Sequence, residues 1–153
     1  MANWCYNVVT FETNPNVLEQ LKQLFELLAE KCEKEEQGQL PDFIQNGNRY
    51  MFSINWEDDT VSYETKWSPN IEEMKQIADH YKTGFNYYYE ELGNLVYGVV
   101  RYENSILTDT CLESADFGLF EENEDDNTWT FEGQKYESEY DILEILLERK
   151  QNN

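Results

Sequence analysis

The sequence has little basic charge, few metal-binding side chains and no long apolar run. Its 153 residues include 11 Lys or Arg, 1 His and 3 Cys against 32 Asp or Glu, so the formal net charge is −21. With one histidine and no Cys-x-x-Cys spacing, we expect no zinc site, no other metal and no cofactor. The chain holds no stretch of 18 apolar residues, so we expect no membrane span.

The acidic excess limits the kinds of partner that the protein can bind. Residues 1–110 hold 19 acidic and 8 basic residues, and residues 111–153 hold 13 acidic and 3 basic residues. A surface this negative repels nucleic acid and anionic membranes and attracts basic partners. We therefore expect no nucleic-acid or membrane binding, and a basic protein is the partner that the charge favours.

The cysteines and the N-terminal residues bear on the compartment. Cys5, Cys32 and Cys111 are an odd number with no paired spacing, which favours reduced, part-buried thiols over a disulfide framework. The first seven residues lack the basic start and apolar stretch of a signal peptide. A cytoplasmic location is the expectation, and the sequence leaves the oligomeric state open.

Strand-forming and helix-capping residues alternate along the first two thirds of the chain. Asn14-Pro15 and Ser68-Pro69 each place a capping residue before a proline, which suits the first position of a helix. The order is that of the split βαβ unit, so we predict an α+β, ferredoxin-like fold whose antiparallel sheet carries two helices on one face. The expected elements are strands at 4–11, 50–55, 61–67, 85–89 and 95–102, and helices at 15–36 and 69–82.

The last third of the sequence has weaker patterns. Gly98, inside the strand at 95–102, predicts a bulge or close packing. Residues 105–120 have no clear period, Glu121 to Asn127 reads as an acidic loop, and Ser138 caps a C-terminal helix. We expect one domain over 1–153, with a ferredoxin-like core at 3–110 and an acidic extension at 111–153. An extra strand and the C-terminal helix extend the core.

Three short motifs stand out from this pattern. They are Asn3-Trp4-Cys5-x-Asn7, Tyr63-Glu64-Thr65-Lys66-Trp67, and Tyr89-Glu90-Glu91-x-Gly93 leading to Gly98. Together they resemble the YubB-type ferredoxin-like domain family over about residues 3–110. Glu64 stands where Gly is usual in the second motif, and a single Pro69 follows where two are common.

The resemblance implies a fold and a biological context. Its members are uncharacterised proteins of plasmids, phages and other mobile elements, so it implies no reaction. The motif residues are candidates for contact with a partner: Asn3, Trp4, Cys5, Asn7, Lys66 and Trp67. The two tryptophans could instead cap the core under the helices, and this core interpretation is the one we favour from sequence.

The sequence contains no recognisable catalytic motif. His80 lacks a placed nucleophile, and there is no Gly-x-Ser-x-Gly or phosphate-binding glycine loop. The alternating aromatics at 85, 87 and 89 lack the basic rim of an RNA platform, which favours core packing. The acidic loop lacks the EF-hand pattern and is expected to be solvated. Its candidate surface residues are Glu121, Glu122, Glu124, Asp125 and Asp126.

Non-enzymatic binding through an acidic surface, in the setting of a mobile element, is the function that these observations favour. One alternative is a DNA mimic that occupies a host DNA-binding or defence protein, since spaced carboxylates can approximate phosphates. Another is an enzyme whose site is built from Tyr, Asp and Glu. The sequence does not decide among the three.

Overall fold

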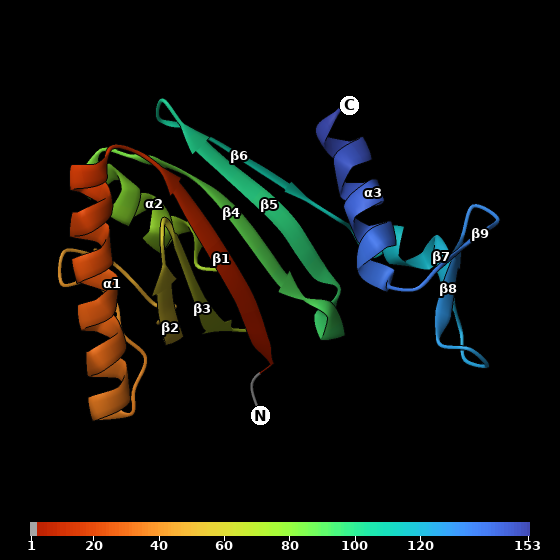
Figure 1. Ribbon diagram of the computed structural model, residues 1–153, viewed down its shortest axis with the longest axis horizontal. Helices are drawn as coiled ribbons and strands as arrows, with labels where there is room; N and C mark the ends of the chain where they lie inside the picture. The colour runs from red at the N-terminus through yellow and green to blue at the C-terminus, as the bar shows by residue number, and fades with distance from the viewer. Residues whose placement is uncertain (1–2) are drawn as a thin grey trace.

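Figure 1 shows a six-stranded antiparallel sheet with helices on both of its faces and a small three-stranded sheet beyond it. The computed structural model describes residues 3–153. In chain order the elements are β1 (Trp4–Glu12), α1 (Pro15–Glu35), β2 (Phe52–Glu57), β3 (Thr60–Lys66), α2 (Ile71–Tyr81), β4 (Gly84–Glu91), a 3₁₀ turn (Leu92–Asn94), β5 (Val96–Glu103), β6 (Ile106–Cys111), a second 3₁₀ turn (Asp116–Gly118), β7 (Phe120–Asn123), β8 (Thr128–Phe131), β9 (Gln134–Tyr136) and α3 (Glu139–Gln151).

The strand order of the large sheet is that of a ferredoxin-like fold with two additional strands. The order is β2-β3-β1-β4-β5-β6, and every neighbouring pair is antiparallel. The first four strands and the two helices between them form the split βαβ unit. The predicted α+β, ferredoxin-like fold is therefore confirmed, and β5 and β6 extend it.

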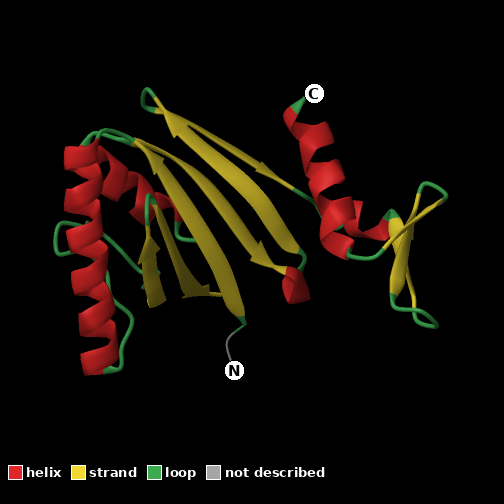
Figure 2. Cartoon of the chain, in the orientation of Figure 1, coloured by secondary structure: helices red, strands yellow, loops and turns green. Residues whose placement is uncertain are grey.

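Helices α1 and α2 cover one face of this sheet (Figure 2), because each has an apolar stripe at helical spacing. Their apolar stripes pack against the buried face of the central strands, which includes the aromatic alternation of β4. That alternation is core, as the sequence predicts. The most buried residues of this layer include Val9, Phe11, Leu21, Phe25, Met74, Ile77, Phe85 and Tyr87.

The helix starts agree with the capping pattern in one case and depart from it in the other. Asn14 accepts a hydrogen bond from the Val17 N–H at 2.9 Å, and Pro15 is the first residue of α1. Helix α2 begins at Ile71, two residues later than predicted. Asn70 holds its N-cap position without a side-chain capping bond, because that side chain is 1% exposed and bonded elsewhere.

Helix α3 lies against the opposite face of the sheet from α1 and α2 (Figure 1). The Ser138 hydroxyl caps it by accepting from the Tyr140 N–H at 3.2 Å. Within residues 3–153, no helix combines the length and the apolar character that crossing a bilayer requires. The second apolar cluster that α3 completes contains Tyr97, Leu112, Phe120, Phe131, Ile142, Leu143, Leu146 and Leu147.

The predicted acidic loop at 121–127 is wrong in its first half. Glu121 and Glu122 belong to β7, which pairs with β8, and only the turn residues between the two strands are irregular. The cause is Phe120 and Phe131, which face each other across the pair and pack into the α3 cluster. This pair of buried rings, at the end of the hairpin away from the turn, holds β7 against β8 although the residues after Phe120 are acidic.

Gly98 is required by close packing and not by a bulge. The pairing of β5 with β4 and with β6 is continuous through Gly98, so no residue is inserted. A Cβ at position 98 would overlap the Tyr89 hydroxyl and lie 2.8 Å from the Thr110 carbonyl oxygen. The Tyr89 side chain uses this space to reach Asp109, to which its hydroxyl donates at 2.8 Å.

Replacing Gly98 with alanine should therefore destabilise the protein. We expect Gly98→Ala to lower the free energy of unfolding by about 1–3 kcal/mol, the usual cost of overpacking. Urea denaturation measures the change. Gly118→Ala is the matched control, because a Cβ there meets nothing within 4 Å. Equal effects of the two substitutions would contradict the close-packing explanation.

Candidate functional site

Each of the first two sequence motifs contributes to both faces of the sheet, because side chains alternate along a strand. On β1, Cys5 and Asn7 face the helices and are 0% exposed, whereas Trp4 is 43% exposed on the other face. On β3, Thr65 is buried and Lys66 is exposed. The motif residues are thus divided between a buried hydrogen-bond network and a surface.

The buried network centres on the side chain of Asn7 in the middle of the sheet. Its amide nitrogen donates to the Thr65 hydroxyl at 3.0 Å, the Cys5 carbonyl at 3.1 Å and the Tyr63 carbonyl at 3.3 Å. Its amide oxygen accepts from the Tyr87 hydroxyl at 2.7 Å. A buried amide is costly unless it is bonded, and this one satisfies both of its ends.

The same network fixes the segment that leads into α2. The Tyr63 hydroxyl donates to the Asn70 side-chain oxygen at 2.6 Å, and the Asn70 backbone N–H donates to the Tyr87 hydroxyl at 3.2 Å. The Thr65 hydroxyl donates to the Ser68 carbonyl at 2.7 Å. The turn between β3 and α2 is therefore bonded to two strands of the sheet, β3 and β4.

A carboxylate on α2 orders the loop before β2 in a similar way. Glu73 is 5% exposed and accepts from the backbone N–H groups of Asn48, at 3.4 Å, and Arg49, at 3.2 Å. The Arg49 guanidinium donates to the Lys66 carbonyl at 2.9 Å. The sequence analysis missed Glu73, which stands in an ordinary helix pattern and gives no local signal.

Burial raises the pKa of the acidic groups in this network. Desolvation raises the pKa of the Cys5 thiol to about 11, and it raises the pKa of both the Tyr63 and the Tyr87 phenol. All three groups are therefore neutral at pH 7. A neutral, enclosed thiol is a poor nucleophile, which makes Cys5 a packing residue.

Two residues of the predicted partner-binding set are corrected by this arrangement. Cys5 and Asn7 cannot touch a partner of the folded protein, because they lie under the helices. Asn3 is exposed, and its carbonyl accepts from the Trp67 N–H at 2.8 Å, which continues the pairing of β1 with β3 by one step. The motif therefore includes fold-determining residues beside surface ones.

The favoured core interpretation of the two motif tryptophans is also wrong. Trp4 is 43% exposed and Trp67 is 49% exposed, both at the end of the sheet where β1 starts and β3 stops. The Trp4 ring stands edge-on to Phe52 with centroids 5.0 Å apart. Alternation with the buried Cys5 and Asn7 was the sequence signal that could have placed Trp4 outside.

Carboxylates flank the aromatic rings on this face. Tyr6 is exposed and lies directly opposite Glu64 on β3 and Glu90 on β4. Glu90 accepts from the Tyr140 hydroxyl of α3 at 3.0 Å and from the Tyr88 hydroxyl, which orients its carboxylate. We call this region the aromatic–acidic surface and define it by Trp4, Tyr6, Phe52, Glu64, Lys66 and Glu90.

Lys66 is the cation of this surface. Its ammonium nitrogen lies 5.4 Å from the Phe52 ring centroid and 6.0 Å from the Trp4 ring centroid. Within residues 3–153, Lys66 forms no ion pair, although Glu64 precedes it by two residues on the same face. The rings of Trp4 and Phe52 thus already hold a positive charge.

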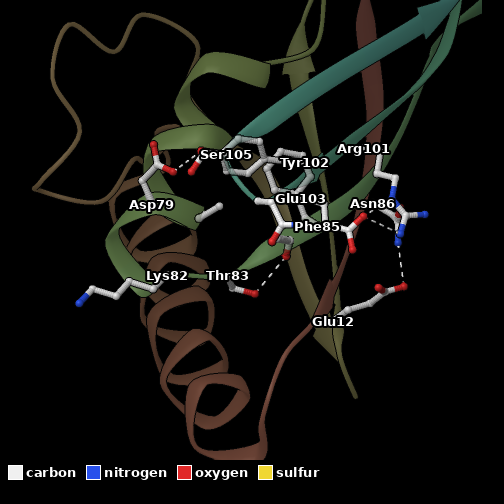
Figure 3. A pocket seen from close by; sticks show the side chains of 13 residues that line it. Glu12, Asp79, Lys82, Thr83, Phe85, Asn86, Arg101, Tyr102, Glu103 and Ser105 are labelled. Carbon is white, nitrogen blue, oxygen red and sulfur yellow. Dashed lines mark hydrogen bonds and ion pairs between the residues drawn. The ribbon is translucent and has the colours of Figure 1, made fainter.

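A hollow of about 450 Å³ opens at the other end of the sheet (Figure 3). Asn86 donates to Glu12 at 3.0 Å, and Arg101 pairs with Glu103 at 3.1 Å. Across the hollow, Asp79 accepts from Tyr102 and pairs with Lys75. Of the charged side chains that line this hollow, all but Lys82 are engaged with a neighbouring side chain.

The single histidine has a structural environment. His80, on α2, stacks on Phe43 with centroids 3.8 Å apart and ring planes 2° apart. It also meets Tyr81 edge-on at 4.9 Å. These contacts make His80 a packing residue between α2 and the segment that contains Phe43. Within residues 3–153, no three His, Cys, Asp or Glu side chains converge as metal ligands would.

The five acidic residues of the predicted surface are dispersed over the β7–β8 hairpin. Asp126 forms an ion pair with Lys135 at 2.7 Å, and this contact holds the pKa of Asp126 down at about 2. Glu121 and Glu122 are adjacent on β7, so their side chains point to opposite sides of the small sheet. The group is therefore no continuous row of carboxylates.

Comparison with known proteins gives a family. A family model described as a ferredoxin-like domain in Api92-like protein matches residues 48–132, which is more than half of the chain. The chain belongs to this family. The matched segment runs from before β2 to the end of β8, and the ferredoxin-like part of the motif resemblance is thereby confirmed. No curated protein and no solved structure matches the chain.

Removing the Asn7 side chain should cost far more stability than removing an exposed asparagine. In a buried site, Asn7→Ala removes the acceptor of the Tyr87 hydroxyl and the amide donor to the Thr65 hydroxyl and to the Cys5 and Tyr63 carbonyls. We expect the free energy of unfolding to fall by about 3 kcal/mol. Chemical denaturation measures it, with Asn16→Ala, an exposed position on α1, as the control. A loss below that of the control would contradict the central role of Asn7.

The raised pKa of Cys5 predicts a loss of stability at alkaline pH. The pKa is 9.0 in the unfolded chain and about 11 in the fold, so the unfolded chain loses this proton first as the pH rises. The stabilisation is complete below pH 9 and is lost as the pH rises toward 11. Urea unfolding across this range should show a smaller loss for Cys5→Ala than for wild type. Cys111→Ala, at an exposed thiol, should follow wild type. Parallel curves for all three proteins would refute the assignment.

Proposed function

We propose that the protein is a non-enzymatic binding protein that docks a basic protein partner on its aromatic–acidic surface. The observation that carries this proposal is the placement of exposed rings beside oriented carboxylates on the sheet face that α3 leaves uncovered. Aromatic anchors dominate the energetics of protein interfaces, and the net charge of −21 attracts a basic partner.

The side chains of the surface match the chemistry of arginine and lysine. A guanidinium stacks on the face of a tryptophan or tyrosine and forms paired hydrogen bonds with a carboxylate. Trp4 and Tyr6 supply the rings, and Glu64 and Glu90 supply carboxylates on either side of Tyr6. Lys66, held over Trp4 and Phe52, is the protein's own example of a cation in this environment.

The biological context is part of the same proposal. The YubB-type resemblance of the motifs supports a role in a plasmid, phage or other mobile element, within the cytoplasm. The DNA-mimic alternative rests on net charge, and an enzyme would need a site other than the described hollow. Neither alternative has a specific arrangement of residues in its favour, so binding of a basic protein is the function we infer.

A capped peptide of alternating glycine and arginine tests the surface directly. We expect wild-type protein to bind it and Trp4→Ala to weaken binding about five-fold, the size of one cation–π contact near 1 kcal/mol. Titration calorimetry at about 0.15 M salt measures both. Leu27→Ala removes an exposed apolar side chain of α1, which covers the other face of the sheet, and should leave the affinity unchanged.

Charge and competition supply two further arms of this experiment. Glu64→Gln should weaken binding more than Glu121→Gln, because only Glu64 belongs to the surface. Lys66→Gln should strengthen binding, because it frees the rings of Trp4 and Phe52 for the peptide's arginine. If all carboxylate substitutions act equally and Trp4→Ala has no effect, the peptide responds to net charge alone and the proposed surface is wrong.

A further inference from the structure

Strand β6 leaves one edge of the large sheet unpaired. It pairs with β5 through residues 106–111, and the Leu112 N–H donates to the Tyr97 carbonyl at 2.9 Å. In an antiparallel pair, alternate residues bond to the partner strand and the residues between them point their backbone groups away. The outward N–H and C=O groups of β6 therefore belong to Leu107, Asp109 and Cys111, and they form no hydrogen bond within residues 3–153.

The opposite edge of the sheet is strand β2, which is irregular and lies beside α1. On β2 the register shifts between Phe52 and Asn55, Ser53 has a positive φ of 52°, and α1 packs alongside. Natural proteins block exposed edges with bulges, prolines or lysines. Strand β6, whose sequence is Ile-Leu-Thr-Asp-Thr-Cys, has none of these, and its pairing with β5 is continuous. Its one charged side chain is Asp109, and α3 lies beside its C-terminal end (Figure 1).

The side chains on the two faces of β6 determine which residues of an added strand would fit beside it. On the face toward the helices, Asp109 accepts from Tyr89 through one oxygen, and it has no ion-pair partner among the described residues. On the other face stand Thr108 and Thr110, with the largely exposed Ile106 at the end. An added strand would meet a carboxylate on one face and β-branched side chains on the other.

A second copy of this chain fits the edge poorly. Two β6 strands paired antiparallel about their middle would place Asp109 opposite Asp109, and like charges directly opposite destabilise a pair. Each copy would also bring its own charge of −21. A strand with a lysine or arginine opposite Asp109 removes both penalties.

We propose that β6 accepts an extended, basic segment of a protein partner as a seventh strand of the sheet. Backbone hydrogen bonds to Leu107, Asp109 and Cys111 supply the affinity, and the residue opposite Asp109 supplies the selectivity. This docking edge is separate from the aromatic–acidic surface, because β5 lies between β6 and β4, the nearest strand of that surface. The two sites can therefore be tested by independent substitutions.

The test uses the peptide acetyl-Thr-Val-Thr-Lys-Thr-Val-Thr-amide with the full chain under reducing conditions. Amide chemical shifts in NMR should change at Leu107, Asp109 and Cys111, and these amides should exchange more slowly. The same peptide with a central glutamate should bind up to about five-fold more weakly, the effect of one cross-strand charge pair. A peptide N-methylated at alternate residues on its pairing edge should not bind.

Asp109→Lys should reverse the preference, so that the glutamate peptide binds more tightly than the lysine peptide. Asp109→Asn should abolish the difference, and it keeps the test decisive if the lysine variant does not fold. Shifts confined to β1 and β3, or binding unaffected by N-methylation, would overturn the proposal. A dimer in sedimentation whose interface is β6 would assign the edge to a second copy and overturn it as well. Neither result would bear on the Trp4 test of the aromatic–acidic surface.

Discussion

The side chain of Asn7 is the constraint on which the rest of the structure depends. It is a polar group in the middle of the sheet, under two helices, and it must be hydrogen-bonded at both ends. Only one register of β1 against β3 and β4 brings Thr65 and Tyr87 within reach. A shift of one residue is already excluded, because it would turn both Asn7 and the apolar side chains of β1 to the other face. A shift of two residues would keep the apolar side chains buried but would move Asn7 away from Thr65 and Tyr87, so the hydrogen bonds of Asn7 select one register.

The same constraint explains why the family-like motifs mix structural and surface residues. Fixing Cys5 and Asn7 toward the helices forces Trp4 and Tyr6 to the open face, since successive side chains alternate. Helix α3 covers part of this open face, and its Tyr140 hydroxyl donates a hydrogen bond to the Glu90 carboxylate beside Tyr6. A surface of exposed rings and carboxylates is therefore a geometric consequence of a buried amide. Its proposed use for binding a basic protein depends on the fixed positions that the buried hydrogen bonds of Asn7 give to these rings and carboxylates.

The sequence predicts those parts of the fold whose signals are local. The run of β-branched and aromatic residues at 4–11 places β1, and Asn14-Pro15 places the start of α1, because residue preference and capping need no distant contact. Asn70 has the same local chemistry as Asn14, yet the Tyr63 and Tyr87 hydroxyls use its side chain and the helix starts without a side-chain cap. Strand β7 could not be predicted for a similar reason: it depends on Phe120 and Phe131 reaching α3, which residues 121–127 do not reveal.

The family match itself illustrates how far this fold depends on distant contacts. It begins at residue 48, after β1 and α1, yet β1 lies between β3 and β4, which do not pair with each other. Tyr63, Thr65 and Tyr87 belong to the matched segment, but the amide that joins them is Asn7, outside it. In this chain, residues 48–132 alone would leave the centre of the sheet open and three buried polar groups without their common partner. The ferredoxin-like domain is complete here only when the N-terminal strand and helix are counted as part of it.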